Sequence, residues 1–133
     1  YIEEALIKGF GCEIDVWRMN DKLFLGHDKP NQEINIDWLS KYKNKLLIHC
    51  KNPLALDYFN KTIGISHIPR KLHYFYHKKD PYTISSWNIP ICYPGMCPLE
   101  DSIYIKPEEA YISKDIKLYG IVSDYISLYQ NNI

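Results

Sequence analysis

The chain has 133 residues, a length typical of one domain, which we expect to span residues 1–133 and to bury a hydrophobic core. Sixteen basic residues balance sixteen acidic ones, which argues against a nucleic-acid partner, because such a partner requires a basic surface. No apolar run approaches the roughly twenty residues of a membrane span, so we expect no transmembrane segment.

Hydrophobic spacing and turn residues predict seven strands separated by short helices and turns. We expect Asp37 to cap the second helix and Asn52 to cap the third, with residues 34–36 as a connector. The expected helices and helical turns are 1–8, 37–43, 53–64, 107–109 and 124–130, and the expected strands are 11–17, 22–27, 45–51, 72–77, 89–93, 102–106 and 119–123. Strands that alternate with helices in this way favour a parallel sheet with crossover connections.

The first expected strand carries two acidic residues at alternate positions. Glu13 and Asp15 therefore share one face, while Ile14 and Val16 point to the other. Two carboxylates side by side on a buried face repel each other, and a divalent cation such as Mg²⁺ or Ca²⁺ relieves that repulsion. The alternative is an exposed pair at a sheet edge. The next strand ends at His27, which lies near the carboxylates if the two strands pair.

The strand at residues 45–51, KLLIHCK, follows the same logic. His49 and Lys51 share a face, and Cys50 points to the opposite one. A buried lysine without a partner is rare, so we expect Lys51 to contact either an acidic side chain in a structural ion pair or a phosphate group.

Together these motifs resemble the glycerophosphodiester phosphodiesterase family. Its signature, Glu-x-Asp on one strand and His-Asp about a dozen residues later, reads here as Glu13-Ile14-Asp15 and His27-Asp28. The resemblance implies a TIM-barrel-like (β/α)8 barrel, here shortened and incomplete at its N-terminus. It also implies metal-dependent cleavage of a phosphodiester, with a small diester or a lipid headgroup as the partner.

The resemblance further implies roles for individual residues. Glu13 and Asp15 would hold the metal, and His49 would join them where the family has a glutamate; an imidazole ligand makes Mn²⁺ an alternative to Mg²⁺ or Ca²⁺. His27 and Lys51 would be catalytic, and Lys51 would also bind the substrate phosphate. The expected substrate-binding residues are Lys51, His77, Trp87, Tyr93 and Asp124.

Two alternatives to hydrolysis stay open. The family's other histidine, in a His-Arg-Gly on a strand expected before Tyr1, has no counterpart here, and this favours a catalytically silent module that binds a phosphate or a headgroup. A lyase that gives a cyclic phosphate, as in related phospholipase D toxins, is the second. Cys92 and Cys97 allow a disulfide, but the four cysteines are better explained as free thiols in a reducing compartment such as the cytoplasm.

Overall fold

The computed structural model describes residues 2–62, 72–109 and 115–129. Its contacts divide the chain into two compact units, unit 1 (residues 1–78) and unit 2 (residues 79–133), each described separately below. The end of the third helix, expected at residue 64, lies outside the described residues.

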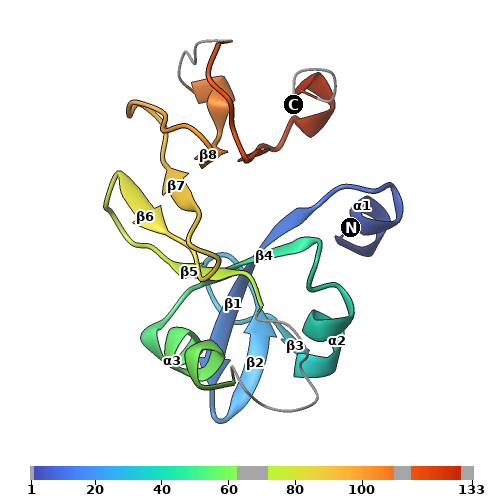
Figure 1. Ribbon diagram of the computed structural model, residues 1–133. Coiled ribbons are helices and arrows are strands. Elements are labelled where there is room, and N and C mark those ends of the chain that lie inside the picture. The colour runs from blue at the N-terminus through green and yellow to red at the C-terminus, as the bar shows by residue number, and fades with distance from the viewer. Residues whose placement is uncertain (1, 63–71, 110–114, 130–133) are drawn as a thin grey trace. The chain divides into compact units, whose positions relative to one another are not determined.

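Unit 1 is built on a five-stranded mixed sheet (Figure 1). Its strands are β1 (Cys12–Met19), β2 (Lys22–Leu25), β3 (Gln32–Ile34), β4 (Leu46–Cys50) and β5 (Tyr74–Tyr76), in the order β3-β2-β1-β4-β5. Strands β1, β4 and β5 run parallel, whereas β2 pairs antiparallel with both β1 and β3. The hairpin between β1 and β2 turns at Asn20 and Asp21, whose φ angles of 52° and 61° suit a tight two-residue turn.

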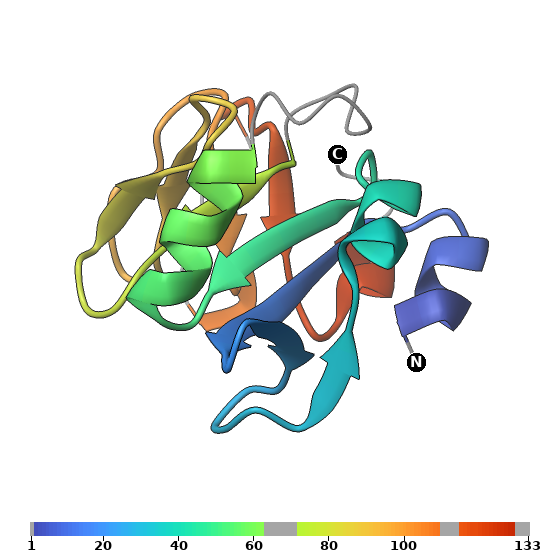
Figure 2. The same ribbon diagram turned by 90° about the horizontal axis from the view of Figure 1, so that it is seen from below.

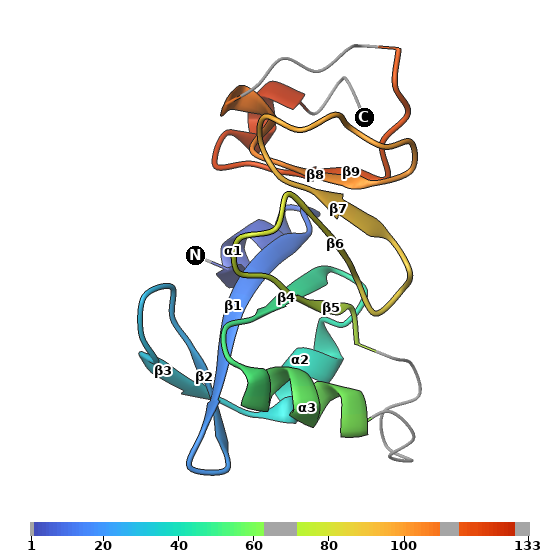
Figure 3. The ribbon, with the colours of Figure 1, turned by 90° about the vertical axis from the view of Figure 1, so that its left-hand side faces the viewer.

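Three helices supply apolar side chains to one face of this sheet. They are α1 (Ile2–Ile7), α2 (Ile36–Lys41) and α3 (Pro53–Thr62). Figure 2 shows α2 and α3 in front of β4, and Figure 3 shows both helices on the same side of the sheet. Leu39 of α2 and Phe59 of α3 pack into one core with the alternate strand residues Ile14, Val16 and Ile48. The expected division of β1 into an apolar face and an acidic face is therefore confirmed.

The two caps of α2 and α3 differ in how well the sequence predicted them. Asn52 accepts a hydrogen bond from the backbone N–H of Ala55 at 3.1 Å, as expected for the residue before α3. The cap of α2 is Asn35, whose side chain accepts from the backbone N–H of Trp38 at 2.9 Å. The prediction of Asp37 as the cap is wrong, because the helix already begins at Ile36.

Unit 2 contains a smaller, four-stranded sheet. Its elements are β6 (Tyr82–Ile84), β7 (Pro90–Cys92), β8 (Ile103–Ile105), β9 (Gly120–Val122) and the 3₁₀ turns η1 (Pro107–Glu109) and η2 (Ile126–Tyr129). Strands β7, β8 and β9 run parallel in that order, and β6 pairs antiparallel with β7. Ile91, Cys92 and Tyr104 are fully buried. All four cysteines are free, so Cys92 and Cys97 form no disulfide.

The predicted TIM-barrel-like (β/α)8 barrel is wrong. The described residues form two separate mixed sheets of five and four strands, with three short helices. Strands β3 and β6 were not expected, and β2, β3 and β6 enter antiparallel pairs that a barrel of parallel strands does not contain. A tight hairpin after β1 forces β2 to run antiparallel to it, where the barrel requires a crossover helix.

Candidate metal centre

Strand pairing brings the two polar motifs of the sequence together in unit 1. The parallel register of β1 and β4 places Asp15 opposite His49. Because the side chains of a strand alternate between faces, Glu13 and Lys51 lie on the same face as this pair, away from the core. Lys51 follows β4 directly, and its backbone N–H donates to the carbonyl oxygen of Val16 at 2.9 Å.

The carboxylate of Asp15 lies at the centre of this cluster. Its Oδ2 is 2.8 Å from Nδ1 of His27, and its Oδ1 is 3.0 Å from Nδ1 of His49. Nζ of Lys51 is 4.0 Å from the same Oδ1. The Asp15 side chain is 15% exposed, whereas that of His27 is 80% exposed. One nearly buried acid therefore contacts one accessible and one enclosed imidazole.

These contacts decide the ionisation of Asp15. Burial acts to raise the pKa of this carboxyl, but hydrogen bonds from His49 and His27 and the positive charges nearby outweigh it, so the pKa is lowered from its usual value. Asp15 is therefore a carboxylate near neutral pH, available as an anionic ligand.

His49 is held in a fixed orientation. Its Nε2 lies 3.2 Å from the carbonyl oxygen of His77, which accepts a hydrogen bond from this nitrogen when the proton is on Nε2. The His49 ring stacks on Phe75, with ring centroids 4.7 Å apart and planes inclined by 11°. Its Nδ1 then faces both acids, at 3.0 Å from Oδ1 of Asp15 and 3.6 Å from Oε1 of Glu13. Phe75 is a contact that the sequence reasoning missed, although its pairing with His49 puts it on the same face.

His27 is carried by a closely packed turn after β2. Gly26 donates its N–H to the carbonyl oxygen of Asp15 at 3.2 Å and accepts a hydrogen bond from the Trp17 indole at 2.6 Å. A Cβ atom at Gly26 would lie 1.9 Å from the carbonyl oxygen of Lys29, so only glycine fits this turn. His27 therefore reaches Asp15 because β2 pairs with β1 and because this turn is tightly closed.

The geometry of Glu13, Asp15 and His49 suits a divalent metal ion. One ligand atom from each residue lies within 4.8 Å of the other two. An octahedral ion bound at about 2.1 Å places its ligand atoms roughly 3 to 4 Å apart, in agreement with the separations of 3.0 and 3.6 Å. The bond from Nε2 of His49 to a backbone carbonyl is also the arrangement that orients histidine ligands in metal sites.

The remaining predicted substrate-binding residues are distributed over both units. His77 follows β5 in unit 1, and its ring centroid is 6.3 Å from that of His49. Trp87, Tyr93 and Asp124 belong to unit 2, and their proposed contact with substrate stays a prediction. The structure thus brings together Glu13, Asp15, His27, His49 and Lys51, with His77 adjacent.

Comparisons with protein-family models, with curated proteins and with solved structures give no match for this chain. Among the described residues, no helix has the length and apolar character required to cross a membrane. The chemistry of the cluster around Asp15 is therefore what indicates a function for this protein.

Proposed function

We propose that the cluster around Asp15 binds a divalent metal ion through Glu13, Asp15 and His49 and cleaves a phosphodiester. Mg²⁺ or Ca²⁺ suits the two carboxylates, and the imidazole adds Mn²⁺ to the candidates. The proposal keeps the chemistry implied by the resemblance to glycerophosphodiester phosphodiesterases, without that family's barrel. A bound divalent ion would polarise a phosphoryl oxygen and so favour displacement at phosphorus.

The observation that carries the proposal is the orientation of His49. A neutral His49 ring carries one proton, yet both of its nitrogens face acceptors, because Nε2 faces the carbonyl oxygen of His77 and Nδ1 faces Asp15 and Glu13. When the proton is on Nε2, Nδ1 directs a lone pair at the two carboxylates. A lone pair directed at two carboxylates is repulsive unless a cation lies among the three groups. A metal ion satisfies this requirement over the whole neutral pH range, whereas a proton does so only while the imidazole is charged.

Lys51 and His27 supply the groups that phosphoryl chemistry requires. Nζ of Lys51, 4.0 Å from Asp15, is close enough to the proposed metal site to neutralise charge on a bound phosphate. Nδ1 of His27 donates to Asp15, while Nε2 lies 3.9 Å from Oδ1 of the exposed Asp28, on a side chain that is itself 80% exposed.

The proposed reaction balances with water as the nucleophile. Water adds to phosphorus as the ester P–O bond breaks, and the leaving oxygen takes the proton from Nε2 of the His27 imidazolium. The proton lost by the attacking water restores the imidazolium through the surrounding solvent. Asp15 stabilises the charged ring and holds its orientation during this exchange.

Calorimetric titration with Mg²⁺, Ca²⁺ and Mn²⁺ tests the metal site, and release of nitrophenolate from bis(4-nitrophenyl) phosphate tests the reaction. We expect Asp15→Asn to abolish metal binding. We expect His27→Gln to retain it and to lower the rate by about 10²- to 10⁴-fold, the usual cost of removing an acid–base group. Glu33→Gln, an exposed change on strand β3 of the same sheet, is the matched control.

Other outcomes lead to other functions. A folded protein that binds none of the three ions would reduce the cluster to a structural ion pair between Lys51 and the acids. Metal binding without turnover of any diester would favour the silent phosphate-binding module. A glycerol diester, which has a neighbouring hydroxyl, separates hydrolysis from the lyase reaction, because phosphorus NMR distinguishes a cyclic phosphate from a monoester.

A further inference from the structure

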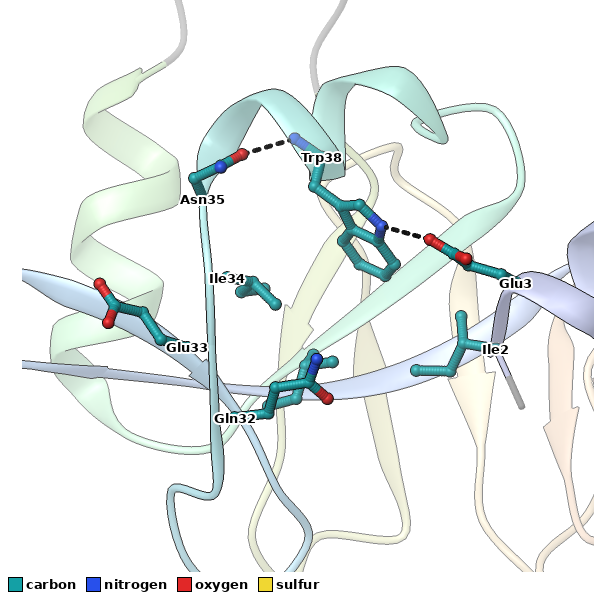
Figure 4. Close-up of a pocket in the computed structure, with 8 residues that line it drawn as sticks. Ile2, Glu3, Gln32, Glu33, Ile34, Asn35 and Trp38 are labelled. Atoms are coloured by element: carbon teal, nitrogen blue, oxygen red, sulfur yellow. Dashed lines mark hydrogen bonds between the residues drawn. The ribbon is translucent and has the colours of Figure 1, made fainter.

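A cavity of about 520 Å³ lies within unit 1, on the helix-covered side of the sheet. Its lining includes Leu25 and Ile34, which also pack against the hydrophobic core, and Trp38 of α2. Figure 4 shows Ile34 and Trp38 with other lining residues. Leu25 is paired with Val16, a core residue whose side chain points away from the face that carries Asp15. The cavity and the metal cluster are therefore on opposite faces of one sheet.

The side chains of Trp38 and Glu3 meet at one end of this cavity. The indole Nε1–H of Trp38 donates to Oε1 of Glu3 at 3.3 Å, which joins α2 to α1 at this end, as Figure 4 shows. The backbone N–H of Trp38 is already bonded to Asn35. Both N–H groups of Trp38 are therefore occupied, so neither is available to an anionic ligand.

The charge of the cavity lining is negative. Its acidic side chain is that of Glu3, because the side chain of Glu33 points away from Ile34 and Trp38, as Figure 4 shows. No lysine, arginine or histidine of the described residues lines it. Glu33 has a distant partner, with its Oε1 3.7 Å from Nζ of Lys22. Among the described residues, no ion pair within 4.0 Å neutralises Glu3. In the described part of the chain, no cationic side chain therefore pairs with the carboxylate next to the indole.

From these observations we propose that this cavity binds a small organic ammonium ion. The ammonium group contacts the indole face of Trp38, whose electron-rich surface attracts cations, and pairs with the carboxylate of Glu3. Its alkyl substituents lie against Leu25 and Ile34. A volume of about 520 Å³ is ample for such an ion and lies in the usual range of small-molecule sites. The site is independent of the proposed phosphodiester chemistry.

NMR titration of the whole protein with tetramethylammonium at constant ionic strength tests this proposal. The readout is the indole Nε1–H signal of Trp38, identified among the three tryptophan signals by its loss in Trp38→Phe. Butylammonium, titrated in the same way, shows whether a primary amine also binds. The neutral molecule tert-butanol, which is similar in size, separates the effect of charge from apolar contact.

We expect saturable shifts of the Trp38 signal with tetramethylammonium and binding at least about fivefold weaker in Glu3→Gln, which removes the charge but can still accept the indole hydrogen bond. Glu4→Gln is the matched control, since Glu4 is on the same helix and pairs with Lys8 at 3.0 Å instead. The proposal is overturned if tert-butanol binds as well as tetramethylammonium, if Glu4→Gln weakens binding as much as Glu3→Gln, or if the Trp38 signal does not saturate.

Discussion

Oδ2 of Asp15 accepts a hydrogen bond from Nδ1 of His27 at 2.8 Å, while Oδ1 of the same carboxylate faces His49 at 3.0 Å. The two oxygens therefore have separate roles in the proposed site. One can bind a metal ion while the other orients the imidazole that exchanges a proton. This division explains how a single acidic side chain can join metal binding to acid–base chemistry.

Metal binding should stabilise the folded protein. An ion that binds the native state alone at about 100 times its Kd raises the free energy of unfolding by about 2.7 kcal/mol. We expect Mg²⁺ or Mn²⁺ to raise the Tm measured by circular dichroism and to leave the Tm of Asp15→Asn unchanged. An equal rise in both proteins would mean that the ions bind elsewhere.

Gly26→Ala should lower the diesterase rate while leaving the metal site intact. The added Cβ would lie 1.9 Å from the carbonyl oxygen of Lys29, so the turn that carries His27 must move. Misplacing a catalytic group by about 1 Å can lower a rate by roughly 10²-fold. We expect the diesterase rate to fall by that order while calorimetric metal affinity stays within about twofold. The matched change Gly95→Ala is also at a positive φ, but in unit 2, and should leave the rate unaltered.

Phe75→Leu should weaken metal binding without removing any ligand. The Phe75 ring is 2% exposed and stacks on His49, so its loss frees the imidazole to rotate away from Asp15 and Glu13. Loss of a group that orients a metal ligand typically costs about 10- to 100-fold in affinity. Calorimetric titration measures this change. Phe75→Tyr, which keeps an aromatic ring, should retain more affinity than Phe75→Leu, and the reverse order would argue against the stacking role.

Asn52→Ala should destabilise unit 1 at the segment that follows Lys51. The Asn52 side chain accepts hydrogen bonds from the N–H groups of Arg18 and Ala55 at 3.1 Å, and it donates to the carbonyl oxygen of Arg18 at 2.9 Å. Loss of a cap and of these bonds should cost about 2 kcal/mol in the free energy of unfolding. Asn52→Asp retains the oxygen that accepts both hydrogen bonds and loses only the donor, so chemical denaturation should place its stability between those of the unchanged protein and Asn52→Ala.

Stability should fall as the pH is lowered from about 6.5 to about 4. Burial lowers the pKa of His73 from 6.5 to about 4, so over this range the unfolded chain binds a proton that the folded protein does not. The free energy of unfolding should decrease by up to about 3 kcal/mol across this interval. Asp15, whose pKa is lowered below its usual value of 3.8, adds a further loss below that pH.

Guanidinium denaturation at several pH values measures this dependence. His73→Gln should flatten the curve between pH 6.5 and 4, whatever its effect on stability at neutral pH. A curve for His73→Gln as steep as that of the unchanged protein would assign the pH dependence to other groups.

The secondary structure was predicted best where the local pattern was strong. Strands β1 and β4, each a run of alternating side chains, and helix α3, with Asn52 and Pro53 at its start, all formed where expected. The short strands β3 and β6 were missed, because three residues are too few to show a period of two. The cap of α2 was misplaced because Asn35 and Asp37 are both good capping residues.

The amino-acid sequence by itself determined which side chains share a face. Alternation in β1 and β4 puts Glu13 and Asp15, and likewise His49 and Lys51, on the face opposite the core. Only the tertiary structure decided that β1 pairs with β4, so that the polar residues of both strands lie side by side on one face. It also decided that His27 reaches Asp15 and that the strands form two mixed sheets instead of a barrel. The reason is physical: alternation depends on the geometry of a single strand, whereas pairing, direction and register depend on contacts between residues far apart in the chain.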